Sequence, residues 1–397
     1  MTRREVLIAR SVVYAILTTL PNGQPARQPS LLARALRIFR LFSLTFRLLR
    51  PDLFRALRGV WEIPEGDYRA SFGAEGTTNE DSGGRGGGRK QRNGKGKGKG
   101  RQKDVLLRMG DMGYSGSTFF RTRDGAYVVK SVPRRFEHEF FKDELLLPYA
   151  EHMRQNPDSL LIRIADMLER THKSIGELLG LAPSHHIVME NILHGQDRAP
   201  GGGAGRKWET WDLKPTSFFY PERDVAGGML ATQATKSKLA DEFDGKLKLS
   251  KAHAVQLREI LEKDTQLLAD NNTVDYSLFL VRISGVNGTD PGSQPPIDPR
   301  QEVDEPILCE GPSPPPSSPD TPSWRTGIPS SDGKEVYRAA ILDFFWAKHT
   351  LHAKVMTGLV RGYNLIDEQG PMSITAESHE YRERFLEMCA GYVEAEE

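Results

Sequence analysis

Cysteine, long apolar runs and net charge are all scarce in this sequence. Two cysteines, Cys309 and Cys389, lie far apart among 397 residues, which excludes a disulfide scaffold and a cysteine-rich zinc site and favours a reducing, intracellular compartment. No run approaches the roughly eighteen apolar residues of a membrane span. A net charge of +1 provides no overall field that would select nucleic acid as a partner.

Acidic residues are rare in the first sixty positions. From Leu31 to Trp61, arginines recur at spacings of three and four among apolar residues, namely Arg34, Arg37, Arg40, Arg47, Arg50, Arg55 and Arg58. This spacing places many of them on one helical face, and Pro51 divides the pattern into two helices. Two interpretations remain open: a basic amphipathic surface on an anionic membrane, or a helical layer with a solvated arginine face.

The extreme N-terminal region has some features of a signal peptide. Basic residues precede a short apolar stretch between Met1 and Leu20, but Arg10 interrupts it and no small-residue cleavage site precedes Pro21. We therefore expect a first amphipathic helix here.

The remaining pattern predicts an α+β protein with two lobes. Three low-complexity segments rich in Gly, Lys, Pro or Ser interrupt the predicted strands and helices, at Ala74–Lys103, Gly195–Lys207 and Ser284–Lys334. We expect strands within Val105–Val132, His186–Ile192, Tyr276–Ile283 and Tyr337–Phe345, and helices at Glu137–Arg154, Asp158–Leu179, Lys251–Ala269 and His379–Val393.

A glycine-rich turn and a lysine follow each other in the first strand-like region. The turn contains Gly113, Ser115, Gly116 and Ser117, and small residues of this kind let backbone amides approach phosphate oxygens. An Asp-Gly turn then leads into an apolar strand that carries Lys130. In kinases a lysine reaches ATP phosphates from the strand beside a glycine-rich loop, whereas a plain hairpin with a solvated lysine is the alternative.

Two aspartates stand at the ends of apolar runs. Asp275 precedes the run from Tyr276 to Ile283, and Asp343 follows Ile341 and Leu342. A buried acid is costly unless it is paired. One aspartate could orient an acceptor hydroxyl and the other could hold Mg²⁺, as in an ATP-dependent phosphotransferase. Each could instead be a strand-end acid that pairs with a neighbouring lysine.

Three further features bear on a nucleotide site. Glu139 or Glu144 could pair with Lys130 from the following helix, and the apolar residues beside Glu144 favour it. The strand that ends at Met189 and Asn191 lies where an interlobe hinge would touch adenine, with a core strand as the alternative. Asp212 and Lys214 would share one side of a strand, facing either phosphates or solvent.

Taken in order, these motifs resemble the core of the phosphatidylinositol phosphate kinase family. The resemblance rests on GYSGS, DGAYVVKS, IVMENIL, DLK, the segment LREILEKDTQLLADNNTVDYSLFLVRI, AILDFF and SHEYRERFLEMCAGYV, and runs from about Arg40 to Val393. It implies a fold distantly like that of protein kinases, with an antiparallel N-lobe sheet, a smaller C-lobe sheet with helices, and ATP between the lobes.

The resemblance also implies roles for individual residues. Gly113, Ser115, Gly116, Ser117, Lys130, Met189 and Asn191 would bind ATP; Asp275 would be the catalytic aspartate, assisted by Asp212 and Lys214; Asp343 would hold Mg²⁺; and Lys348, His349, His352, Lys354 and Arg361 would contact the lipid headgroup. The expected reaction is phosphorylation of phosphatidylinositol 4-phosphate at position 5. The expected partners are ATP and an anionic phosphoinositide membrane, and nucleic acid is not expected to bind. The protein would be cytoplasmic and would act peripherally at the cytosolic face of membranes. A homodimer is compatible with this function.

The same resemblance suggests a division of the chain. It comprises a basic helical segment at 1–73, a disordered insertion at 74–103, an N-lobe at 104–194, a first C-lobe part at 195–283, a second disordered insertion at 284–334 and a second C-lobe part at 335–397.

Two departures from the family pattern motivate a competing hypothesis. Pro215 stands where the DLKGS-type motif has glycine, and Val281-Arg282 replace the usual Gly-Ile. A proline removes a backbone amide and stiffens the turn. The alternative functions are therefore a pseudokinase-like scaffold that binds phosphoinositides, or a soluble small-molecule kinase of related fold.

Overall fold

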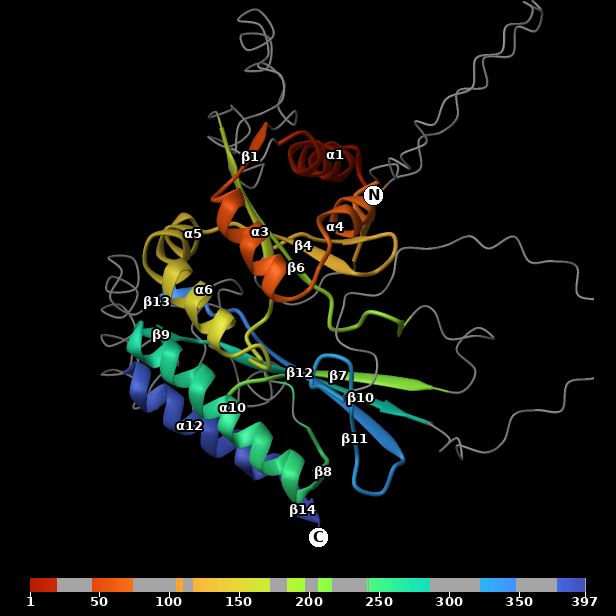
Figure 1. The fold of residues 1–397 in the computed structure, drawn as a ribbon, viewed down its shortest axis with the longest axis vertical. Helices are drawn as coiled ribbons and strands as arrows, with labels where there is room; N and C mark the ends of the chain where they lie inside the picture. Colours follow the sequence, from red (N-terminus) through yellow and green to blue (C-terminus); the bar gives the residue numbers. More distant parts are fainter. Residues whose placement is uncertain are drawn as a thin grey trace, which may run out of the picture.

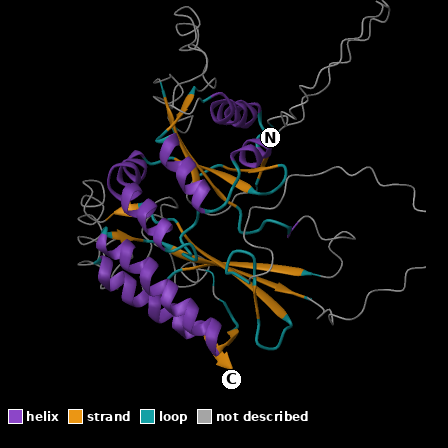
Figure 2. Ribbon diagram, in the orientation of Figure 1, coloured by secondary structure: helices purple, strands orange, loops and turns teal. Residues whose placement is uncertain are grey.

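The protein is described by a computed structural model over residues 1–19, 45–73, 105–109, 117–171, 184–196, 206–215, 241, 243–285, 322–347 and 377–396. Two antiparallel sheets, each with its own helices, lie one above the other (Figures 1 and 2). The α+β prediction is confirmed. No helix within these ranges is both long enough and apolar enough to cross a membrane.

The upper sheet has six strands in the order β1-β5-β6-β4-β3-β2, with every neighbouring pair antiparallel. The strands are β1 (Phe46–Leu48), β2 (Leu106–Arg108), β3 (Phe119–Thr122), β4 (Tyr127–Val132), β5 (Ile164–Arg170) and β6 (His185–Glu190). Gly125, with φ +76°, makes the tight β3–β4 turn. Every residue of β4 is buried because this strand lies inside the sheet.

Helices surround this upper sheet. They are α1 (Arg3–Thr18), α3 (Pro51–Val60), α4 (Glu65–Ser71), α5 (Arg135–Phe140) and α6 (Leu146–Gln155), with a π-helical segment, Phe141–Leu145, between the last two. Helix α1 confirms the expected N-terminal amphipathic helix. Thr2 and Glu5 form a capping box at its start, and Ile8, Val12 and Ile16 are buried along one face.

The lower sheet has the order β11-β12-β10-β7. Its strands are β7 (Lys207–Leu213), β10 (Ser277–Ser284), β11 (Ile328–Pro329) and β12 (Glu335–Leu342). Helices α10 (Lys251–Asp270) and α12 (Ser378–Tyr392) run side by side along it (Figure 1). Two small pairs complete the lobe, β8 (Leu247–Ser250) with β14 (Val393–Glu396) and β9 (Thr273–Val274) with β13 (Trp346–Ala347).

Two sequence-based expectations are wrong. The helix expected at Asp158–Leu179 is replaced over Ile164–Arg170 by β5, an inner strand of the upper sheet. A short apolar run buried on both faces cannot be told from a helix by periodicity alone. The low-complexity segment expected at Ser284–Lys334 ends before Lys334, because Trp324 and Ile328 are buried and β11 pairs with β12.

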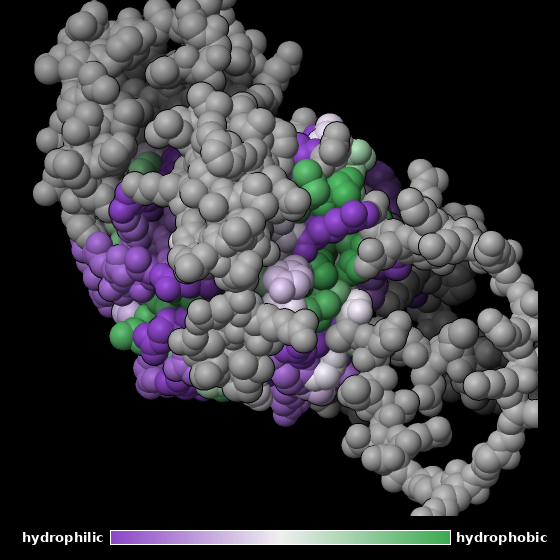
Figure 3. Space-filling view, turned by 90° about the horizontal axis from the view of Figure 1, so that it is seen from above, coloured by the Kyte–Doolittle hydropathy of each residue, from purple (hydrophilic) through white to green (hydrophobic). Residues whose placement is uncertain are grey.

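The arginines predicted to lie on a membrane-facing basic surface or on a solvated helical face are mostly paired where they are described. Arg47 binds Glu169, Arg55 lies 3.9 Å from Glu65, and Arg58 is 2% exposed and bound to Asp166. Arg34, Arg37 and Arg40 lie outside the described residues. Where described residues are visible from above, hydrophilic and apolar areas alternate (Figure 3). The described arginines therefore form no continuous basic helical face, because Arg47 lies in strand β1 where a helix was expected and Arg58 belongs to the core.

Candidate active site

Three strand ends of the lower sheet meet at one place. In the antiparallel register, Ser277 at the start of β10 is opposite Leu342 at the end of β12. On its other side, Leu278 of β10 is opposite Leu213 at the end of β7. Asp343 and Lys214 directly follow these strand ends, and Asp275 lies just before β10. The sheet register thus brings together three of the predicted site residues.

Both aspartates adopt an unusual backbone conformation. Asp275 has φ +66° and Asp343 has φ +61°, in the left-handed region that few non-glycine residues enter. The amide of Phe345 donates to the Asp343 carbonyl at 2.9 Å, which closes a tight turn beyond β12. Left-handed residues other than glycine cluster at functional sites, where the surrounding structure holds them in place.

Lys214 is a buried lysine that holds Asp275. Its Nζ donates to the Asp275 backbone carbonyl at 2.7 Å and to the Asp275 carboxylate at 3.0 Å, and the residue is 8% exposed. Burial alone would lower the pKa of Lys214, but the carboxylates of Asp275, Asp212 and Asp343 outweigh it and raise that pKa. Lys214 therefore remains charged and lies within the electrostatic field of all three predicted acids.

Lys130 connects the two sheets. It lies on β4 of the upper sheet, and its Nζ forms an ion pair with Asp343 of the lower sheet. The lysine side chain is 11% exposed and the aspartate side chain 42% exposed, so the pair opens towards solvent on the aspartate side. The ring of Phe119 lies 5.5 Å from the same Nζ. The upper and lower halves of the predicted site are thus in direct contact.

The partner predicted for Lys130 on the following helix is wrong. Glu144 is exposed, and Glu139 pairs with Arg135 at 2.7 Å. The acid in the electrostatic environment of Lys130 and Asp343 is Glu137, whose carboxylate accepts from Arg134 at 2.9 Å. Burial raises the pKa of Glu137 to about 7, against the lowering effects of Arg134 and Lys130. No sequence pattern distinguished Glu137, because the choice among the acids of α5 and of the π-helical segment after it depends on how these helices pack.

The strand end expected to contact adenine is β6. Met189 is half-buried, opposite Val128 on one side and Ile164 on the other. The Asn191 side chain donates to the Gly125 carbonyl at 2.7 Å, and its backbone amide donates to Ala126. Asn191 thus fixes the end of β6 to the β3–β4 turn.

Other predicted residues fall partly outside the described structure. Ser117 is described and half-buried, next to Thr118, whose amide donates to the Ser131 hydroxyl at 2.8 Å. Gly113, Ser115, Gly116, Lys348, His349, His352, Lys354 and Arg361 lie outside the described residues. Trp346, shortly before the last group, packs edge-on against Phe136 of α5 with ring centroids 4.8 Å apart.

The departure at Arg282 has a local structural explanation. Its guanidinium binds Glu209 on the neighbouring strand at 2.8 Å and lies 5.1 Å from the Trp211 ring. Arg282 pairs in register with Glu209 and Tyr337, well along β10 from the strand end at Asp275. This arginine is therefore accommodated by the sheet and does not contact the lysine–aspartate cluster.

Two antiparallel sheets joined by a lysine–aspartate pair, with a second such pair beside it, define a protein of the two-lobed kinase class. The family model described as Phosphatidylinositol-4-phosphate 5-Kinase matches residues 101–392, and the chain belongs to this family.

The individual relatives have low sequence identity to this chain. A phosphatidylinositol 4-phosphate 5-kinase of Plasmodium falciparum is 26% identical over 251 residues, 59% of this chain and 12% of that protein. The phosphatidylinositol 4-phosphate 5-kinase its3 of Schizosaccharomyces pombe is 24% identical over 152 residues, 38% of this chain and 16% of that protein. A type-1 beta phosphatidylinositol 4-phosphate 5-kinase of Gallus gallus is 27% identical over 181 residues, 45% of this chain and 30% of that protein. The chain therefore spans only 12% to 30% of the length of these relatives.

Proposed function

We propose that this protein is a lipid kinase that transfers the γ-phosphate of ATP to an inositol-ring hydroxyl of a phosphatidylinositol monophosphate at a membrane surface. The observation that carries the proposal is the convergence of Lys130, Lys214, Asp275 and Asp343 at the junction of the two sheets. Phosphoryl transfer depends mainly on positioning and on charge stabilisation, and this cluster offers two cations and two carboxylates for that purpose.

Each of these residues has a role that follows from its position. Asp275 would accept the proton of the acceptor hydroxyl, and Lys214 would hold Asp275 in place by donating to its carboxylate and to its backbone carbonyl. Lys130 would bind ATP phosphates, exchanging its present contact with Asp343 for the nucleotide. Asp212, which contributes to the field around Lys214, would keep this lysine charged.

Asp343 fits the role of the Mg²⁺ ligand. Its carboxylate is 42% exposed at a strand end, and Lys214 lies within its electrostatic reach. The described residues contain no cluster of three or more metal-ligating side chains. Mg²⁺ usually binds one or two carboxylates together with water and substrate phosphates, so a single strand-end carboxylate can serve as its protein ligand. When bound, Mg²⁺ would neutralise charge on the ATP phosphates.

The preferred substrate follows from the family and is part of the proposal. The family description and the relatives' names support phosphatidylinositol 4-phosphate as acceptor and position 5 as the site of phosphorylation. An anionic phosphoinositide membrane and ATP are then the partners, with the protein peripheral at the cytosolic face of the membrane and able to act as a homodimer. Lys348, His352, Lys354 and Arg361 remain the proposed headgroup contacts.

The proposal is tested with radiolabelled ATP and a panel of phosphoinositides on vesicles, with product isomers resolved. Lys130→Met and Asp343→Asn are each expected to abolish lipid phosphorylation while the protein remains folded by circular dichroism. Lys248→Met is the matched control, because Lys248 pairs with Asp332 at the surface, away from the cluster. Full activity in either site variant would contradict the mechanism, and product formed without vesicles would favour a soluble small-molecule kinase.

A pseudokinase-like scaffold is the second candidate. Pro215, a buried residue next to Lys214, favours it because proline offers no amide to a phosphate. Nucleotide binding without transfer to any phosphoinositide would support this function. Arg282 no longer supports it, because its contacts lie within the sheet.

A further inference from the structure

Two segments of the upper lobe lie against the lower sheet at the junction of the lobes. Residues 159–162 run alongside β12, where the Ile341 amide donates to the Leu160 carbonyl at 2.7 Å and the Ile162 amide donates to the Ile341 carbonyl at 3.1 Å. The end of β6 lies next to them, because the Glu190 amide donates to the Arg163 carbonyl at 3.0 Å. The relative position of the lobes therefore depends on what holds these two segments.

Arg325 contacts both segments with one guanidinium. It comes from the turn before β11 in the lower sheet, and its side chain is 8% exposed. One end of the guanidinium forms an ion pair with Glu190, and the other donates to the carbonyls of Ser159 and Leu161, the latter at 2.9 Å. Burial, together with the nearby Arg163, lowers the pKa of Arg325 well below its usual range.

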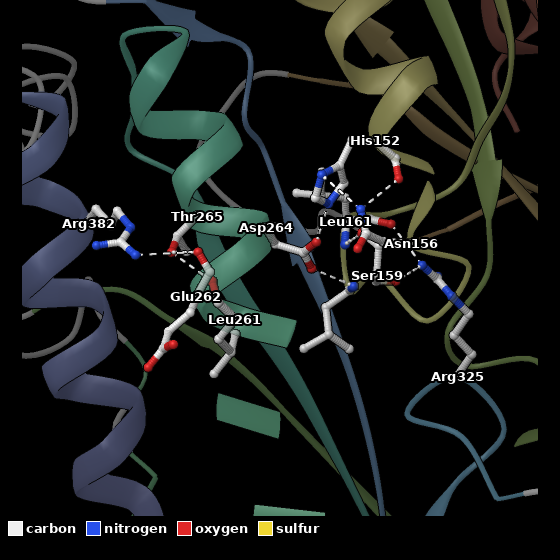
Figure 4. A network of polar contacts seen from close by, with 11 residues as sticks. His152, Asn156, Ser159, Leu161, Leu261, Glu262, Asp264, Thr265, Arg325 and Arg382 are labelled. Atoms are coloured by element: carbon white, nitrogen blue, oxygen red, sulfur yellow. Dashed lines mark hydrogen bonds and ion pairs between the residues drawn. The ribbon is translucent and has the colours of Figure 1, made fainter. Parts of the chain in front are cut away.

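The opposite side of residues 159–161 is held by a different buried group (Figure 4). Asp264 of α10 is fully buried, accepts from the Leu160 amide at 2.6 Å and bonds His152 of α6 at 2.6 Å. The segment therefore has carbonyls bound by Arg325 and an amide bound by Asp264. Arg338 in turn holds the Arg325 turn by donating to the Thr326 carbonyl at 3.0 Å. With both sides fixed, Arg325 extends this network to Glu190 at the end of β6, while Arg338 donates to the carbonyls of Ile192 and His194 just beyond it, at 3.0 and 2.8 Å.

We propose that Arg325 is a positioning residue for nucleotide binding, which fixes the Met189–Asn191 end of β6 against the lower sheet. This inference rests on the proposed function, because it takes that strand end as the adenine contact. The Glu190 carboxylate transmits the effect, since it accepts both from Arg325 and from the Arg163 amide at 2.9 Å. Arginine is suited to the task because its planar fork reaches three acceptors at once, which a lysine ammonium on its flexible stem does not.

Steady-state kinetics on vesicles test the inference. Arg325→Lys is expected to raise the KM for ATP about tenfold, which corresponds to about 1.4 kcal/mol. The same variant is expected to change kcat less than threefold and to leave the KM for lipid unchanged. Glu190→Gln is expected to raise the same KM, and the double variant to be no worse than the more affected single one. The matched control is Arg282→Lys, at another paired arginine of the same lobe, which is expected to leave the KM for ATP unchanged.

Hydrogen exchange supplies a readout that needs no activity. In Arg325→Lys, amides of residues 189–194 are expected to exchange at least tenfold faster without nucleotide, while those of β10 remain as protected as in the wild type. Unchanged exchange and unchanged KM for ATP would overturn the inference even if the wild type is an active kinase. A wild type that phosphorylates no lipid, but whose 189–194 amides respond to Arg325→Lys and whose nucleotide affinity falls with it, would overturn the proposed function alone. Equal losses of kcat/KM for ATP and of kcat/KM for lipid, together with a lowered melting temperature, would indicate general destabilisation. This result would also overturn the inference.

Discussion

Replacing Glu137 with glutamine should change how the stability of this protein depends on pH. Glu137 is an acid whose pKa rises from an ordinary value of 4.5 to about 7 on folding, mainly because it is buried. The folded state therefore holds a proton on Glu137 between these two values, where the unfolded chain has released it. By linkage, the contribution of Glu137 to the free energy of unfolding decreases as pH rises from about 4.5 through 7.

The size of the effect follows from the two pKa values. A difference of about 2.5 pKa units corresponds to about 3 kcal/mol when the group is fully titrated, of which about 2 to 3 kcal/mol should appear between pH 5 and pH 8. Glutamine cannot ionise, so Glu137→Gln should become more stable relative to the wild type over this interval. The pKa of about 7 already includes the lowering effect of Arg134, so the loss of this contact adds no separate pH-dependent contribution.

Urea unfolding at pH 5, 6, 7 and 8, followed by circular dichroism, measures the difference. Glu139→Gln is the control, because Glu139 lies on the same helix, is 44% exposed and is paired with Arg135. Its difference from the wild type is expected to stay nearly constant with pH. If the Glu137→Gln difference is also constant between pH 5 and pH 8, Glu137 is not held protonated by burial and the reasoning fails.

Three further substitutions test the structure around the site. Asp166→Asn should cost about 3 kcal/mol of stability in thermal unfolding, because it removes the buried carboxylate partner of the Arg58 guanidinium and leaves it only the partly exposed Glu65; a change below 1 kcal/mol would show that Glu65 alone compensates this charge. Phe344→Ala should cost about 3 to 5 kcal/mol in urea unfolding, because this ring is fully buried and stacks on Tyr149, and a fully stable variant would contradict the packing next to Asp343. Arg282→Ala should lower stability by about 1 kcal/mol while leaving lipid phosphorylation unchanged, because its partners lie within the sheet; lost activity with an unaltered fold would tie this departure to the chemistry.

Part of the fold was predictable because local pattern and tertiary environment agree. The amphipathic pattern at Lys251–Ala269 predicted α10 nearly to the residue, and an Asp-Gly pair predicted the turn at Gly125. The prediction failed at Ile164–Arg170, where burial on both faces removes the alternation that marks a strand. It also failed for Arg58, whose spacing suggested a solvated face and which instead pairs with Asp166 in the core.

The candidate site residues could be singled out from the sequence alone. Asp275 and Asp343 are conspicuous as acids at the ends of apolar runs, and Lys130 as a lysine in an apolar strand after a turn. Tertiary structure alone decided their partners, because Lys130 and Asp343 are 213 positions apart and meet only through the packing of two sheets. It likewise selected Glu137 over Glu144, since the burial of one acid on a helix depends on the surface packed against that helix.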